Sequence, residues 1–135
     1  MPFRFLEHTA DVRVECTAET FDGLLDTAAQ ALYAITLATR RAGVDRDRTV
    51  TISGAAYDEV FLRWLQELIF LLESDHFVAT KFQFSSLPDN GVTARLSGYM
   101  CDAADRAEEV KSATYHELEV RKTDEGFLAH VIFDL

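Results

Sequence analysis

Hydrophobic and polar residues alternate through most of the second half of this 135-residue chain. The alternation covers residues 76–86 and 92–100 on either side of the sequence LPDNG, then residues 110–122 and 127–135 on either side of TDEG. A period of two residues is typical of a strand with one buried face, and junctions of this composition favour hairpins. We therefore predict four strands, joined in pairs.

The first half of the chain combines shorter strand patterns with helical ones. Residues 3–7, 11–17 and 49–53 alternate and predict three more strands. Residues 20–37 place apolar side chains three and four positions apart, which is the spacing of a helix face. Thr20 is well suited to cap the first turn of this helix.

The most apolar segment of the chain, residues 58–75, also has helical spacing, and Asp58 can cap its start. One stripe consists of Val60, Phe61, Trp64, Leu65, Leu68, Ile69 and Leu72, and it is broadened by Leu62, Phe70 and Leu71. A helix that is apolar over so much of its circumference is usually covered by a sheet or by a partner. Burial in the core of the same chain is the simpler interpretation.

Length and composition indicate one domain that spans residues 1–135. A chain of this size, with 48% hydrophobic residues, buries a sufficient core without disulfide bonds. The order of the predicted elements favours an α+β fold. In this fold a mostly antiparallel sheet of six to seven strands carries two helices on one face.

The sequence carries no signal for a membrane or for secretion. No apolar run approaches the ~18 residues of a membrane span, and the first residues lack the apolar segment of a signal peptide. Cys16 and Cys101 lie far apart and show no metal-binding spacing, which is typical of a reducing compartment. We expect a cytoplasmic protein that does not associate with membranes.

The charge of the chain argues against direct binding of nucleic acid. Thirteen Lys and Arg residues face 23 Asp and Glu residues, for a net charge of −10. Binding of a phosphate backbone normally needs clustered cations. The nearest basic groups, Arg40–Arg41 and Arg46–Arg48, fall in one predicted loop and are more simply explained as solvated side chains.

Acidic groups near the two ends of the sequence suggest a cation site. Asp11 opens an early strand, whereas the last strand runs into Asp134 and Leu135, which carries a main-chain carboxylate. Three carboxylates brought together repel one another unless a cation neutralises them, and oxygen ligands select Ca²⁺, Mg²⁺ or Mn²⁺. Spacing alone does not bring Asp11 to Asp134, and Asp11 taken by itself is also a common turn residue.

Four blocks of the sequence together resemble the archease family. They are FLEHTADV at 5–12, WLQELIFLLESDHF at 64–77, EVKSATYHELEV at 109–120 and the final VIFDL. The blocks occur in the order typical of the family and span nearly the whole chain. The combination of EHTAD, TYH and a final Asp plus aliphatic residue carries the resemblance.

The resemblance implies a non-catalytic accessory protein of the RtcB-type RNA ligase, which joins tRNA halves after intron removal and repairs RNA. Such a protein promotes GTP-dependent guanylylation of the ligase and permits multiple turnovers. The resemblance also implies a metal site formed by Asp11, Asp134 and Leu135, with Ca²⁺ as the associated ion. Relatives often carry Gly at the position of Arg13, but the metal ligands are retained here.

The competing hypothesis is a small metal-dependent hydrolase of phosphate esters. In that case Asp11 and Asp134 hold the ion, and His8 or His116 acts as the base. Strand alternation instead predicts that His116 is partly buried and hydrogen-bonded, and His8 is more simply a turn residue. No motif of a catalytic nucleophile is present in the sequence, so we expect a protein that is not an enzyme.

Three further polar residues have simple explanations. Lys111 precedes a strand and is expected to form an exposed ion pair, with contact to the acidic cluster or to the ligase as the alternative. His76 and His130 lack a spacing that would support a site.

Overall fold

The computed structural model describes residues 2–6, 11–88 and 90–135. This part of the chain contains seven strands, two α-helices and one short 3-10 helix. The strands are β1 (Phe3–Leu6), β2 (Val12–Ala18), β3 (Arg46–Ile52), β4 (Phe77–Ser86), β5 (Val92–Met100), β6 (Ser112–Thr123) and β7 (Gly126–Asp134). The helices are α1 (Phe21–Thr36), α2 (Tyr57–Asp75) and the 3-10 helix η1 (Ala103–Asp105).

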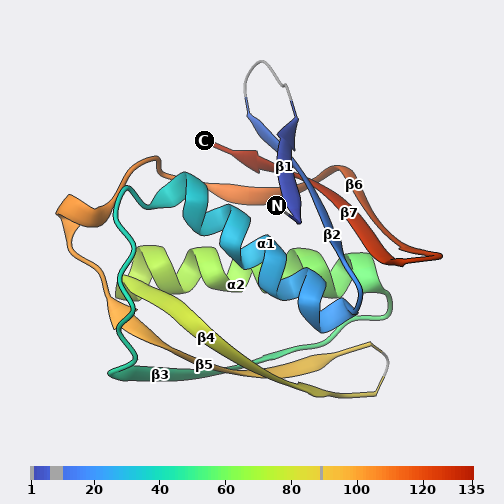
Figure 1. Ribbon diagram of the computed structural model, residues 1–135, viewed down its shortest axis with the longest axis horizontal. Helices are drawn as coiled ribbons and strands as arrows, with labels where there is room; N and C mark the ends of the chain where they lie inside the picture. Colours follow the sequence, from blue (N-terminus) through green and yellow to red (C-terminus); the bar gives the residue numbers. More distant parts are fainter. Residues whose placement is uncertain (1, 7–10, 89) are drawn as a thin grey trace.

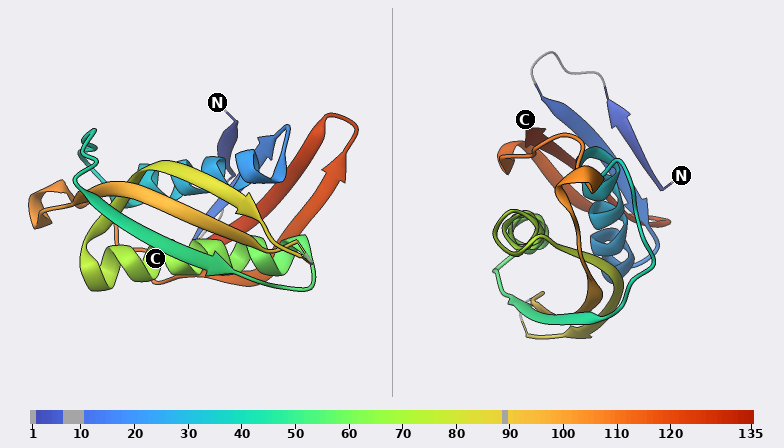
Figure 2. Two further views of the ribbon diagram at one scale, coloured as in Figure 1. Left: turned by 90° about the horizontal axis from the view of Figure 1, so that it is seen from below. Right: turned by 90° about the vertical axis from the view of Figure 1, so that its left-hand side faces the viewer.

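The described strands form two antiparallel sheets with both α-helices between them (Figure 1, Figure 2). One sheet has the order β1-β2-β7-β6, and the other has the order β3-β5-β4. The α+β class and the antiparallel pairing are confirmed, but the strands do not share one sheet. Because α2 connects β3 to β4 and also contacts β6, it separates the two sheets.

Two hydrogen bonds from buried aromatic residues connect the layers. The indole of Trp64 on α2 donates to the carbonyl oxygen of Leu25 on α1 at 2.8 Å. The hydroxyl of Tyr33 on α1 accepts from the backbone N–H of Ala79 on β4 at 3.1 Å. Both aromatic side chains are fully buried, so their polar atoms need these partners. The bonds fix α1 against α2 and against the three-stranded sheet.

The two helices begin differently from one another. Thr20 caps α1 as predicted, because its hydroxyl accepts from the N–H of Gly23 at 3.0 Å. The prediction for Asp58 is wrong. Ala56 is the extended residue that precedes α2, so Asp58 already lies in the first turn and accepts from the N–H of Glu59.

The apolar stripe of α2 is buried with one exception. Leu62 and Leu71 belong to the core as expected, whereas Phe70 is 57% exposed. Phe70 lies on the same side of the helix as Gln66 and Glu73, which are exposed polar residues at helical spacing. The helix therefore carries one large aromatic side chain on its solvent side.

A bulge in β6 reverses the predicted burial of His116. Thr114 pairs with Ile132 and Glu119 pairs with His130, so several residues of β6 lie opposite a single residue of β7. A bulge of this kind breaks the alternation between the two faces. The side chain of His116 is 75% exposed, and Tyr115 is 67% exposed. The prediction of a partly buried histidine is wrong for this reason.

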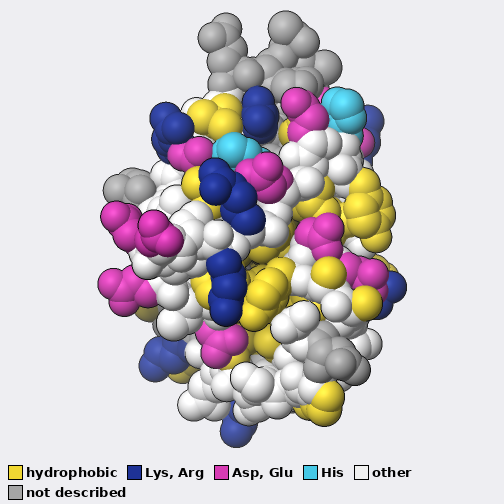
Figure 3. Space-filling view, turned by 90° about the vertical axis from the view of Figure 1, so that its right-hand side faces the viewer, with side chains coloured by type: hydrophobic (Ala, Val, Ile, Leu, Met, Phe, Trp, Pro, Cys, Tyr) yellow, Lys and Arg dark blue, Asp and Glu magenta, His cyan; other side chains and the backbone are white. Residues whose placement is uncertain are grey.

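The structure also shows the state of the cysteines and the distribution of charge on one face. Cys16 and Cys101 are both buried and free. Among the described residues, no helix is both long enough and apolar enough to cross a membrane. Figure 3 views the end of the molecule that carries the turn between β6 and β7, and there cationic and anionic side chains are interspersed. The described residues on this face do not form a continuous patch of Lys and Arg side chains.

Candidate metal centre

The pairing of β2 with β7 brings the two sequence-predicted aspartates to the same end of the sheet. The antiparallel register matches Val12 with Phe133. Asp11 immediately precedes Val12, and Asp134 immediately follows Phe133. Asp11 and Asp134 therefore flank the last paired position at this end of the sheet. Both residues are half-buried, so neither carboxylate is surrounded by water on all sides.

Asp134 is also connected to β6. Its position pairs with Ser112, whose hydroxyl lies 3.4 Å from the Asp134 carboxylate. The backbone N–H of Lys111 donates to the carbonyl oxygen of Asp134 at 2.8 Å. Strand β7 is thus paired with β2 up to Phe133 and with β6 up to Asp134, and Leu135 follows with 38% exposure.

The donor atoms at this end of the sheet fit a hard cation. Asp11 and Asp134 offer carboxylate oxygens, and the resemblance given above implies Leu135 as the third ligand, whereas no sulfur or imidazole of the described residues is grouped with them. Oxygen ligands of this kind suit Ca²⁺ or Mg²⁺. Among the described residues no group of three or more His, Cys, Asp or Glu side chains is placed to hold a metal ion. Residues 7–10 of the EHTAD block, which include Glu7 and His8, lie outside the described residues.

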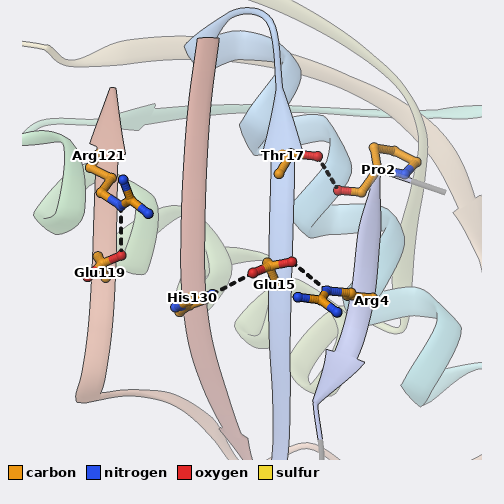
Figure 4. A network of polar contacts seen from close by, with 7 residues as sticks. All are labelled: Pro2, Arg4, Glu15, Thr17, Glu119, Arg121 and His130. Carbon is orange, nitrogen blue, oxygen red and sulfur yellow. Dashed lines mark hydrogen bonds and ion pairs between the residues drawn. The ribbon is translucent and has the colours of Figure 1, made fainter. Parts of the chain in front are cut away.

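A polar network lies on the same sheet, four residues further along β2 (Figure 4). Glu15 binds Arg4 of β1, and its other carboxylate oxygen lies 2.9 Å from Nε2 of His130 on β7. The hydrogen bonds from Arg4 and His130 lower the pKa of Glu15 to about 2. The network connects the edge strand β1 to the centre of the sheet.

The sequence offered no signal for this network. Glu15 and His130 are separated by 115 residues. Only the β2–β7 register, which pairs them directly, brings them together. No spacing in the sequence supports a site at His130, whereas the structure gives it a defined partner in Glu15.

The histidines and cysteines do not form a hydrolytic centre within the described residues. His116 is exposed, and its Nε2 lies 3.7 Å from the carboxylate of the adjacent Glu117. Burial raises the pKa of the Cys16 thiol to about 12, so it remains protonated at neutral pH. His8, the other candidate base, lies outside the described residues.

Comparison with known proteins identifies the family. The sequence model of the archease protein family matches residues 3–135. The chain belongs to the archease family. It is 32% identical over 137 residues to the archease of Archaeoglobus fulgidus, with all of both chains covered. It is 30% identical to the archease of Methanosarcina mazei over 98% of this chain and 95% of that protein.

Solved structures support the same archease fold. The solution structure of a Methanobacterium thermoautotrophicum protein matches with a TM-score of 0.76 and 24% identity over 99% of both chains. The crystal structure of a Thermotoga maritima archease, described as a possible chaperone, matches with a TM-score of 0.67 and 20% identity. That match covers 96% of this chain and 94% of the other. At these identities the similarity concerns the fold.

Proposed function

We propose that this archease is a non-catalytic, metal-binding activator of an RtcB-type RNA ligase in the cytoplasm. It would promote guanylylation of the ligase by GTP and support repeated rounds of ligation in tRNA splicing and RNA repair. Membership of the family supports an accessory role in general. The observation that carries the proposal is the register of β2 with β7, which pairs Val12 with Phe133, the chain neighbours of Asp11 and Asp134.

The metal would be held by the carboxylates of Asp11 and Asp134 and by the main-chain carboxylate of Leu135. Because each donor atom is an oxygen, the site suits Ca²⁺, Mg²⁺ or Mn²⁺, and Ca²⁺ is favoured because it is the ion that the resemblance to the family implies. When bound, the ion supplies positive charge that offsets the mutual repulsion of the carboxylates. Ser112, which hydrogen-bonds to Asp134, would hold that carboxylate in place.

The protein would act on the ligase through this end of the sheet. We propose that it binds more tightly to the ligase conformation that is competent for GMP transfer than to other conformations. A protein that distinguishes two conformations shifts their populations in proportion to its difference in affinity. An alternative is that the carboxylates help to seat the ligase's own metal ions.

Multiple-turnover ligation is the direct test. Purified ligase, GTP, divalent metal and a cleaved RNA are assayed with and without this protein, and attachment of GMP to the ligase is followed in parallel. We expect more product per ligase molecule, and we expect Asp11→Asn and Asp134→Asn to remove the effect. Asp45→Asn is the matched control, because this carboxylate is 70% exposed in the connection before β3.

The outcome also separates the accessory role from the hydrolase hypothesis. The accessory role predicts no turnover of phosphate esters by the protein alone and stimulation only when ligase and GTP are present. Metal-dependent hydrolysis by the isolated protein, lost in Asp11→Asn, would support the hydrolase instead. A folded, metal-loaded protein that leaves the cognate ligase unchanged would contradict the proposed function.

A further inference from the structure

A small hollow separates α2 from the start of β6. It has a volume of about 280 Å³, and its lining includes Phe70 and Glu73 of α2 together with Lys111 and Ser112. The neighbouring side chain of Gln66 donates to the carbonyl oxygen of Ala113 at 3.4 Å and bridges the helix to the strand. The hollow is therefore formed by two elements that are fixed to one another.

The floor of the hollow is apolar. Phe70 is 57% exposed although it belongs to a helix whose other large apolar side chains are buried. When a partner covers a phenyl ring that is exposed to this extent, a substantial apolar area is removed from water, and this burial favours binding. The stripe of α2 suggests cover either by a sheet or by a partner, and Phe70 is the one residue of the stripe that the rest of the described chain leaves mostly exposed.

The rim of the hollow carries a positive charge. The carboxylate of Glu73 is bound by the guanidinium of Arg106, so its charge is already compensated. Within the described part of the chain, no carboxylate pairs with the ammonium group of Lys111. In a chain with a net charge of −10, this cation beside an apolar floor favours a segment that presents an apolar side chain next to a carboxylate.

The hollow is continuous with the candidate metal centre. Ser112 lines the hollow and also hydrogen-bonds to the side chain of Asp134. Lys111 lines it and donates its backbone N–H to the carbonyl oxygen of Asp134. Phe70, which lines the hollow, and Leu135, which directly follows Asp134, are both exposed large hydrophobic residues. A partner that reaches the metal centre would therefore also meet the hollow.

We propose that the hollow between α2 and β6 is the docking site for the partner ligase. The ligase would insert an apolar side chain against Phe70 and set an adjacent carboxylate near Lys111. The identity of the partner rests on the proposed function, but the two roles are separable because the hollow provides affinity and the metal centre provides activation. A nucleic acid does not fit, since phosphates would meet an acidic chain and an apolar floor.

The test uses substitutions that change the hollow and leave the metal ligands in place. The variants are Phe70→Ser, which removes the apolar floor, and Lys111→Glu, which reverses the charge at the rim. Val44→Ser is the matched control, because Val44 is 48% exposed in the connection between α1 and β3. Affinity for the full-length ligase is measured by calorimetry, calcium binding by titration of the protein alone, and activation by multiple-turnover ligation.

We expect each hollow variant to bind the ligase at least tenfold more weakly, with an unchanged calcium titration. Stimulation should be recovered when the variant is supplied in excess, whereas Asp134→Asn should fail at every concentration. Val44→Ser should behave as the unsubstituted protein. Circular dichroism confirms that each variant is folded, and Lys111→Glu tests the same hollow without changing α2.

The possible results separate the two proposals. If the unsubstituted protein binds and stimulates the ligase but both variants bind equally well, the docking inference is overturned and the proposed function stands. If the unsubstituted protein neither binds nor stimulates, the proposed function fails and the inference fails with it. Dissociation of a homodimer by Phe70→Ser, seen by sedimentation with ligase affinity unchanged, would assign the hollow to a second copy and overturn the inference.

Discussion

Glu15 joins three strands through one carboxylate. It binds Arg4 of β1 and His130 of β7 while its own backbone belongs to β2, and its side chain is 18% exposed. Its pKa falls from the ordinary value of 4.5 to about 2, mainly through the hydrogen bond from Arg4 and next through that from His130. A carboxyl group with a lowered folded pKa stabilises the fold above about pH 4.5. This stabilisation is lost as the pH falls from there through about 2.

Replacement of this carboxylate tests its contribution directly. We expect Glu15→Gln to lower the free energy of unfolding at pH 7 by about 1–2 kcal/mol, because the charged hydrogen bonds are lost. The difference between the two proteins should shrink as the pH falls from 4.5 toward 2. Urea unfolding at a series of pH values measures both effects. Glu19→Gln, at an exposed position after β2, is the control, and an equal loss in that variant would contradict the role of the network.

Helix α2 shows what hydrophobic periodicity predicts and what it omits. The pattern predicted both α-helices and their buried faces, because the 3.6-residue period depends only on nearby residues. It also assigned Phe70 to a broadened core face, since the apolar character of a side chain does not reveal whether a neighbouring element covers it. In β6 the alternation failed at Tyr115 and His116 because a bulge depends on pairing with β7, which lies elsewhere in the chain.

Trp64 is one of the fully buried residues that anchor α2 to the rest of the core. Its ring packs against Phe82 and Phe84 of β4 with centroid distances of 5.8 and 5.4 Å, and its indole donates to Leu25. We expect Trp64→Phe to lower the free energy of unfolding by about 1–3 kcal/mol, because the hydrogen bond is lost and a small cavity remains. Denaturant unfolding measures the loss. Ser74→Ala, on the exposed side of α2, should change stability by less than about 0.5 kcal/mol.

Across the whole molecule, the candidate metal centre depends on contact between segments from opposite ends of the sequence. The residue types at Asp11 and Asp134 already indicated a hard cation, and their strands were recognisable from alternation. Their proximity was not predictable from spacing, because the β2–β7 register is set by long-range pairing of buried residues such as Val14 with Val131. The Glu15–His130 contact was missed for the same physical reason.

Calcium should therefore stabilise the whole fold through this centre. A ligand that binds only the folded state raises the melting temperature as its concentration increases. We expect this rise in the unsubstituted protein and its loss when a tag is appended after Leu135, since the tag turns the main-chain carboxylate into an amide. The same tag placed before Met1 should leave the rise unchanged. Identical calcium titrations of the two tagged proteins would remove Leu135 from the proposed ligands.

The central place of β7 in its sheet has a consequence for synthesis. Strand β7 lies between β2 and β6, so one edge of β2 has no strand to bond until residues up to Asp134 have left the ribosome. The nascent chain must carry the β1–β2 hairpin with an open edge while almost all the remaining residues are translated. Open strand edges are sites of aggregation. A ribosome stalled before β7 should therefore hold an incomplete domain that binds the cell's molecular chaperones.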